Sequence, residues 1–199
     1  KGKINFLNNP SLESQTSSIS DDIAYNSHDL EDGLKAELFK LSDLENIPIV
    51  SNIITEHKKN LKKHDKNLVL RQIIRDIINE MVKDVVMNTK KNIKFKKIKD
   101  IKGVYKSDIT LVNFSKTMRD FDSGIKSFLM QNMYQHKKVL NKTESGKKII
   151  KTLFNTLKKH PLKYIKKDIL NTYAQERAIC DFIAGMTDRY AINLYNSLK

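Results

Sequence analysis

Hydrophobic residues recur at helical spacing along most of the chain. The clearest case is segment 67–93, where they return every three or four positions: Leu70, Ile73, Ile74, Ile77, Ile78, Met81, Val85 and Val86. This period is typical of an α-helix with one buried face. Similar spacing predicts further helices within residues 11–39, 115–136, 143–160 and 168–198.

Glycine, proline and one ambiguous segment interrupt this pattern. Gly33 weakens the first helix or divides it in two, Pro48 begins a new segment, and Pro161 ends a helix. Residues 92–115 alternate apolar and basic positions, which fits either a short strand pair or a basic loop. The chain shows neither repeats nor a linker, so the sequence predicts one mainly α-helical unit over residues 1–199.

The composition adds a strong positive charge. The chain has 37 Lys and Arg residues against 23 Asp and Glu, for a net charge of +14. Such a charge indicates either attraction to polyanions or a solvated lysine-rich surface, and only five of the basic residues are arginine. The longest apolar runs fall short of the roughly 18 residues of a membrane span, so we expect no membrane association. A single cysteine, Cys180, favours the reducing cytoplasm.

Against this basic background, "SDDIAYNSHDLEDG" collects five acidic residues between Ser20 and Gly33. On a helix, Asp21, Tyr25 and Asp29 stand at i, i+4 and i+8 and therefore share one face. Carboxylates on such a face suit a metal, a cation or a polar ligand. Spacing alone favours the alternative, an amphipathic surface helix whose acids pair with the surplus lysines, because acidic helices are common, but it does not decide between the two.

Three longer blocks, in order along the chain, resemble one known family. They are "SLESQTSSISDDIAYNSHDLEDGLKAELF", "IKSFLMQNMYQHKKV" and "RAICDFIAGMTDRYA". Each is similar to a motif of the bacterial deoxyguanosinetriphosphate triphosphohydrolase-like family, and the separations are comparable. The resemblance therefore spans essentially the whole chain.

The resemblance implies an all-α fold, the C-terminal part of an HD-superfamily helical domain. The alternation described above adds a small irregular or β insertion around residues 92–112. The resemblance also implies a hydrolase that cleaves a deoxynucleoside triphosphate (dNTP) into a deoxynucleoside and tripolyphosphate, as dGTPases do. The family binds a divalent metal, Mg²⁺, Mn²⁺ or another transition metal, through a histidine, a His-Asp pair and a later aspartate. Such an ion polarises the phosphate and lowers the pKa of a bound water.

The first block carries three residues with roles in that family. Asp21 matches the later metal-binding aspartate. Tyr25 matches the tyrosine that packs on the deoxyribose, and Asp29 matches the acid that accepts the 3′-hydroxyl. By resemblance, this helix face is one wall of a deoxynucleotide pocket.

The second block adds three candidate substrate-binding residues, Lys126, Tyr134 and His136. Lys126 stands where the family usually has arginine, so it keeps the charge and loses the bidentate geometry. Tyr134 fits a core aromatic beside Phe128 and Met133 as well as it fits a nucleotide contact. His136, taken without the family, reads as a surface histidine.

The family's first histidine and its His-Asp pair have no counterpart in this sequence. The two "HD" words, at His28 and His64, lie in other contexts. We expect the missing ligands upstream of Lys1, so that residues 1–45 end the metal and nucleotide core and residues 46–199 form a C-terminal helical region. With Asp21 as one metal ligand and no catalytic residue of its own, the chain alone is expected to be inactive.

Two other classes of function stay open. The basic segments 56–66 and 90–102 suit a helical module that binds nucleic acid, and some members of the family bind single-stranded DNA. The other class is a non-catalytic assembly module, since members of the family form homo-oligomers. The expected partners are therefore deoxynucleoside triphosphates, further copies of the chain and single-stranded DNA.

Overall fold

The computed structural model describes residues 9–61 and 63–198, and these residues are mainly helical and contain no strand. The predicted all-α fold is therefore confirmed. The elements are, in chain order, α1 (Leu12–Lys35), η1 (Leu41–Leu44), α2 (Pro48–Leu61), α3 (Lys66–Phe95), α4 (Ile101–Tyr105), α5 (Lys116–Leu129), η2 (Met130–Tyr134), α6 (Lys137–Lys159), η3 (Pro161–Lys163), α7 (Lys167–Thr172), α8 (Gln175–Ala184) and α9 (Asp188–Ser197).

The helices pack into two compact units that meet in the sequence between Gln135 and His136. We call them the N-terminal unit, up to Gln135, and the C-terminal unit, from His136 onward. The sequence shows no boundary at this point and predicts a single unit. The division instead follows the packing, because each unit has a hydrophobic core of its own.

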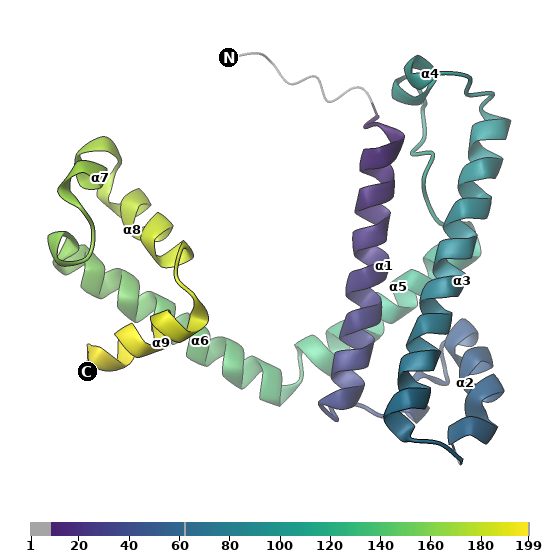
Figure 1. Ribbon diagram of the computed structural model, residues 1–199, viewed down its shortest axis with the longest axis horizontal. Coiled ribbons are helices and arrows are strands. Elements are labelled where there is room, and N and C mark those ends of the chain that lie inside the picture. The colour runs from purple at the N-terminus through teal and green to yellow at the C-terminus, as the bar shows by residue number, and fades with distance from the viewer. Residues whose placement is uncertain (1–8, 62, 199) are drawn as a thin grey trace. The chain divides into compact units, whose positions relative to one another are not determined.

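In the N-terminal unit, α1 and α3 lie side by side, and α2 and α5 pack against them (Figure 1). The predicted apolar face of α3 is buried at Ile73, Ile77 and Met81, each fully inaccessible to solvent. Val86, at the edge of that face, is 46% exposed. The core is thus built on the long amphipathic helix that the periodicity indicates most clearly.

Helix α1 continues through Gly33 and ends at Lys35, so the glycine does not divide it. The reason for a glycine here is a close approach, since the ring of Phe39 lies directly against it. A Cβ at position 33 would lie 2.3 Å from Cε1 of Phe39. Gly33 is therefore a packing residue of the helix.

The ambiguous segment around residues 92–112 forms no strand. Helix α3 extends to Phe95, Asp100 caps the short α4, and irregular backbone connects the two and leads on to α5. Gln15 of α1 holds this backbone, since its Oε1 accepts hydrogen bonds from the amides of Leu111 and Val112 at 2.8 and 3.0 Å. Of the two alternatives, the irregular basic loop is correct.

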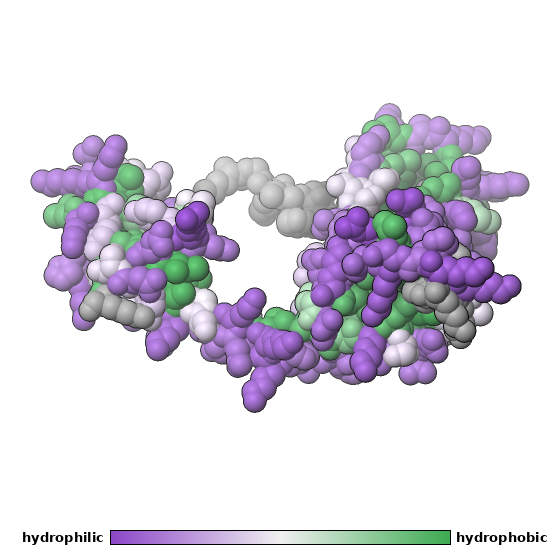
Figure 2. Space-filling model, turned by 60° about the horizontal axis from the view of Figure 1, so that its bottom comes forward, coloured by the Kyte–Doolittle hydropathy of each residue, from purple (hydrophilic) through white to green (hydrophobic). Residues whose placement is uncertain are grey.

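In the C-terminal unit, α6 packs against α8 and α9 around Leu153, Leu157 and Ile179. The segment 168–198 forms three helices, because Tyr173 is extended and Thr187 caps a new helix start. Hydrophilic side chains cover most of each unit in the view of Figure 2. None of the helices within the described ranges combines the length and the apolar character that crossing a bilayer requires.

Candidate functional site

Helix α1 carries three of the candidate residues, Asp21, Tyr25 and Asp29, on successive turns. Asp21 is exposed, Tyr25 is 58% exposed and Asp29 is half-buried. Ser11 is the N-cap of the helix, and its Oγ accepts a hydrogen bond from the backbone amide of Ser14. This cap determines where the helix begins and so which turn each candidate residue occupies. The face therefore passes from solvent at Asp21 to a partly covered position at Asp29.

Tyr134 approaches this face from the end of α5. Its hydroxyl donates a hydrogen bond to Oδ2 of Asp29. Helix α5 widens after Leu129 into the π-helical turn η2, Met130–Tyr134, and Tyr134 is its last residue. Its ring is also half-buried against the core next to Phe128 and Met133. Tyr134 thus packs as a core aromatic and also contacts the candidate face.

The position of Tyr134 changes its acidity. Burial of the phenol, followed by its hydrogen bonds with Asp29 and Tyr25, raises its pKa far above the usual value of 10.0. The two tyrosines and the carboxylate therefore form one connected cluster, Tyr25–Asp29–Tyr134. The phenol acts in it as a hydrogen-bond donor, which holds one oxygen of Asp29.

We expect Tyr134 to stay protonated at a pH at which ordinary tyrosines ionise, and Asp29→Asn to bring its pKa closer to 10.0. Because the pKa of Tyr134 is raised in the folded protein, the contribution of its protonated phenol to the free energy of unfolding is complete below pH 10.0. This contribution is lost as the pH rises above that value. NMR of ¹³C-labelled tyrosine measures this, and the signal missing in Tyr134→Phe identifies the residue. A Tyr134 signal that titrates with the other tyrosines would contradict the cluster.

Lys126 lies on α5 among carboxylates. Its Nζ is 2.8 Å from Oδ2 of Asp122 and 3.6 Å from Oδ2 of Asp22. Burial lowers the pKa of this ammonium, but the hydrogen bond and charge of Asp122, with a smaller part from Asp22, outweigh it, and the pKa is raised. Asp122 also accepts a hydrogen bond from Nδ2 of Asn26 on α1 at 2.8 Å. Lys126 thus has one carboxylate partner on its own helix, Asp122, and a more distant one on α1, Asp22.

His136 belongs to the other unit, as the N-cap of α6. Its Nδ1 accepts a hydrogen bond from the amide of Lys138 at 3.2 Å. This cap uses one ring nitrogen and leaves Nε2 for another partner. Five of the six candidate residues therefore lie in the N-terminal unit, and His136 begins the C-terminal one.

Residues 9–61 and 63–198 contain no group of three or more His, Cys, Asp and Glu side chains placed to hold a metal. Asp21 can supply one exposed carboxylate, and carboxylate oxygen is the ligand type that Mg²⁺ and Mn²⁺ prefer. The donor chemistry fits a hard divalent cation at a single coordination position. Asp21 is thus suited to be one ligand of a larger set.

Two polar contacts escaped the sequence analysis. The pair Asn26–Asp122 joins residues 96 positions apart, for which the sequence holds no signal. His57 contacts Asp76 at 2.7 Å across α2 and α3, although its sequence neighbours suggest no partner. The ion pair between Asp122 and Lys126 could be predicted from the sequence, because residues i and i+4 of a helix are neighbours on its surface.

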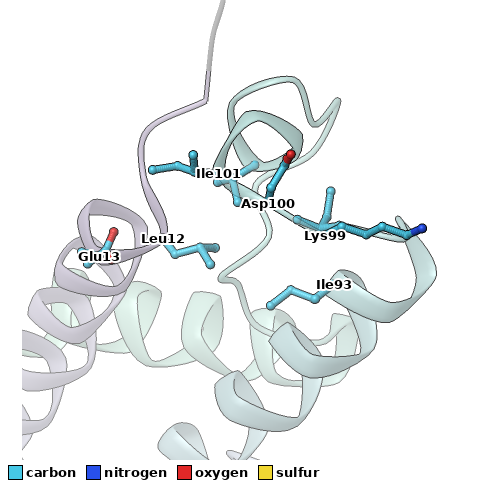
Figure 3. A pocket seen from close by; sticks show the side chains of 8 residues that line it. Leu12, Glu13, Ile93, Lys99, Asp100 and Ile101 are labelled. Atoms are coloured by element: carbon cyan, nitrogen blue, oxygen red, sulfur yellow. The ribbon is translucent and has the colours of Figure 1, made fainter.

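A separate cavity of about 310 Å³ lies where α1 begins (Figure 3). Leu12 of α1 points toward Ile93 of α3 there, and Glu13 together with Lys99 and Asp100, from the loop leading into α4, also lines the cavity. The candidate residues do not line this cavity. The candidate site is therefore the outer face of α1 and not this hollow.

Comparisons with known proteins agree on one family. The profile described as "Phosphohydrolase-associated domain" matches residues 112–197. A "Deoxyguanosinetriphosphate triphosphohydrolase-like protein" of Pelagibacter ubique is 49% identical over 194 residues, which are 98% of this chain and 52% of the relative. Relatives of the same name in Leptospira interrogans and Bartonella henselae are 36% and 34% identical over 96% and 94% of this chain, and over 51% and 48% of their own lengths.

The chain therefore spans about half the length of the curated relatives it matches. The aligned region takes in 98% of this chain for the relative from Pelagibacter ubique. These matches agree with the all-helical fold and with the three sequence blocks. The chain belongs to the family of deoxyguanosinetriphosphate triphosphohydrolase-like proteins.

Proposed function

We propose that the natural full-length polypeptide carrying this chain is a metal-dependent dNTP triphosphohydrolase. The observation that supports it best is the Tyr25–Asp29–Tyr134 cluster. In it, Tyr25 and Asp29, matched to the sugar-binding positions of the family, meet Tyr134, matched to a position near the bound nucleotide. The substrates are deoxynucleoside triphosphates, and the products are a deoxynucleoside and tripolyphosphate. The chain contributes binding residues and one metal ligand to this reaction.

The cluster suits the sugar of a deoxynucleotide. Tyr25, which is 58% exposed, offers its ring to the deoxyribose, where a 2′-hydroxyl would be crowded. Tyr134 occupies Oδ2 of Asp29, which leaves Oδ1 to accept the 3′-hydroxyl. A carboxylate held in this way needs no rearrangement when the sugar binds, and such preorganisation lowers the cost of binding.

The phosphates would meet the other candidate residues. Asp21 would hold a divalent cation, which polarises the phosphate and activates a water when bound. The ammonium of Lys126 would bind a phosphate oxygen in place of its more distant carboxylate partner, Asp22, which lies 3.6 Å away. His136 would use Nε2, because Nδ1 caps α6.

Product analysis tests this proposal directly. The full-length polypeptide is incubated with each dNTP and with Mn²⁺ or Mg²⁺, and the products are separated by anion exchange. We expect tripolyphosphate in equal amount to free deoxynucleoside, and neither product when EDTA removes the metal. No release from any single dNTP or mixture, including dGTP as an activator, would contradict the proposal.

Assembly and location follow the same proposal. A homo-oligomer would appear as a multiple of the monomer mass in light scattering, and a monomer would count against assembly. The cytoplasm is the proposed compartment, because the single cysteine, Cys180, is an exposed free thiol that persists in a reducing environment.

A second candidate function is binding of single-stranded DNA at the end of α3. Phe95 is 76% exposed, and the ammonium of Lys96 lies 5.7 Å from its ring centre. Ile101 of α4 is 58% exposed in the same basic segment. An exposed aromatic ring among lysines is the combination on which successive bases stack while the backbone meets positive charge.

We expect Phe95→Ala to weaken binding of labelled oligo(dT) by roughly 5- to 150-fold, because stacking contributes about 1–3 kcal/mol per base. Binding should also fall steeply with added salt. Tyr173→Ala is the matched control, since Tyr173 is a similarly exposed aromatic, at 56%, in the C-terminal unit. Equal affinities for the two variants, or no binding at low salt, would remove this candidate.

A further inference from the structure

A carboxylate is buried between α5 and α1, away from the surface face described above. The side chain of Asp122 is 11% exposed, and Asn26 opposite it is 3% exposed as a residue. An ionised carboxylate in such a position is costly unless its oxygens are hydrogen-bonded. Its presence therefore calls for an account of what it holds.

Each oxygen of Asp122 has a partner. Oδ1 accepts a hydrogen bond from Nδ2 of Asn26 across the helix interface, at 2.8 Å. Oδ2 forms an ion pair with Nζ of Lys126, also at 2.8 Å. The carboxylate thus links one residue of α1 to one residue of its own helix. Hydrogen bonds that involve an ionised group are directional and stronger than neutral ones, so this link restricts how α1 can turn.

The link acts at the turn that carries the candidate sugar-binding residues. Asn26 directly follows Tyr25 and stands three residues before Asp29. One residue of rotation in an α-helix is about 100°, so holding Asn26 against α5 determines where its neighbours point. Tyr134, at the end of the π turn that continues α5, holds Asp29. Helix α5 and the π turn η2 are therefore hydrogen-bonded to α1 at two residues, Asn26 and Asp29.

An apolar pair would join the same helices without the cost of burying a charge. Replacing buried ionic groups by apolar groups of similar volume is often neutral or stabilising, so stability alone does not account for Asp122. What apolar contacts lack is direction, since the hydrophobic effect is non-directional. The polar link between Asp122 and Asn26 is therefore better suited to orient α1 against α5 than merely to hold the two helices together.

We propose that Asp122 is a positioning residue for the deoxynucleotide wall of α1, acting through Asn26 to orient Tyr25 and Asp29 and holding the ammonium of Lys126 near Asp22 of the same helix. The ligand class is the 2′-deoxyribose triphosphate of the proposed reaction, and this inference rests on that proposal. Asp122 itself does not touch the substrate.

The decisive variant replaces both partners, Asn26→Leu together with Asp122→Leu, in the full-length polypeptide. The apolar pair should keep the melting temperature close to that of the wild type, whereas the Michaelis constant for a dNTP should rise by roughly tenfold with a smaller change in kcat. Asn26→Ala, which removes the donor and leaves Asp122 paired with Lys126, serves if the double variant fails to fold, and it should raise the Michaelis constant in the same way. Asp120→Asn is the matched control, an exposed aspartate on the same helix.

A second readout does not depend on turnover. If Asp122 orients α1, the double variant should loosen the bond between Tyr134 and Asp29, and the tyrosine NMR signal of Tyr134 should titrate at lower pH than in the wild type. Asp120→Asn removes a charge from the same helix and should leave that signal unchanged. Wild-type values of both the Michaelis constant and the Tyr134 titration in the double variant would overturn the inference.

The two proposals fail in different ways. Absence of hydrolysis in the wild type, with a Tyr134 titration that responds to Asp122, would remove the reaction and keep the positioning role on α1. Hydrolysis in the wild type, with unchanged kinetics and titration in the double variant, would keep the reaction and leave Asp122 as a structural ion pair only.

Discussion

Replacing Gly33 with alanine is expected to destabilise the N-terminal unit by roughly 1–3 kcal/mol, as overpacking of a core does. The new Cβ would lie 2.3 and 2.4 Å from two ring carbons of Phe39, well inside the usual contact of about 3.5–4.0 Å. The ring has little room to withdraw, because Phe39 is buried and meets Phe128 edge-on at 4.9 Å. The result runs against helix propensity, which favours alanine over glycine by about 1 kcal/mol.

Gly124→Ala is the control for this prediction. Gly124 also lies inside a helix, α5, but a Cβ there would have no atom within 4 Å. We expect this variant to be stabilised by about 0.5–1 kcal/mol, since only propensity and chain entropy act. Urea unfolding of both variants measures the difference. Destabilisation of both, or of neither, would show that the contact with Phe39 does not decide the choice of glycine.

Asp21→Asn is expected to lower metal-dependent hydrolysis by the full-length polypeptide by about 100-fold or more. Asparagine keeps the size of the side chain and removes the negative charge that a divalent cation requires. Loss of residues that merely orient metal ligands typically costs about 10–100-fold, so a direct ligand should cost at least as much. Asp21 is exposed on α1, so the substitution should leave folding intact.

The matched control is Asp32→Asn, which removes the same charge from another exposed position of the same helix. It should leave turnover unchanged within a factor of about two, because exposed charges are strongly screened. Turnover is measured as tripolyphosphate release over a range of Mn²⁺ concentrations. An Asp21→Asn variant as active as Asp32→Asn would exclude Asp21 as a metal ligand.

Local patterns in the sequence were sufficient for the long helices α1, α3, α5 and most of α6, and for the candidate face of α1. The apolar period of α3 predicted a long helix with one buried face, because a period of 3.6 residues reflects a single local geometry. The spacing of Asp21, Tyr25 and Asp29 likewise depends only on residues within one helix. The family resemblance rested on contiguous words, and the comparisons agree with it.

The tertiary structure alone decided which distant residues meet. Tyr134 and Asp29 are 105 positions apart, and Asp122 and Asn26 are 96 apart, so neither pair leaves a local trace. The irregular course around residues 92–112 depends on Gln15, far away in the chain, and the need for glycine at position 33 depends on where the ring of Phe39 packs. The division after Gln135 likewise follows from two separate cores. Helical periodicity is written in neighbouring residues, whereas these contacts arise when whole helices pack, and packing depends on the entire chain.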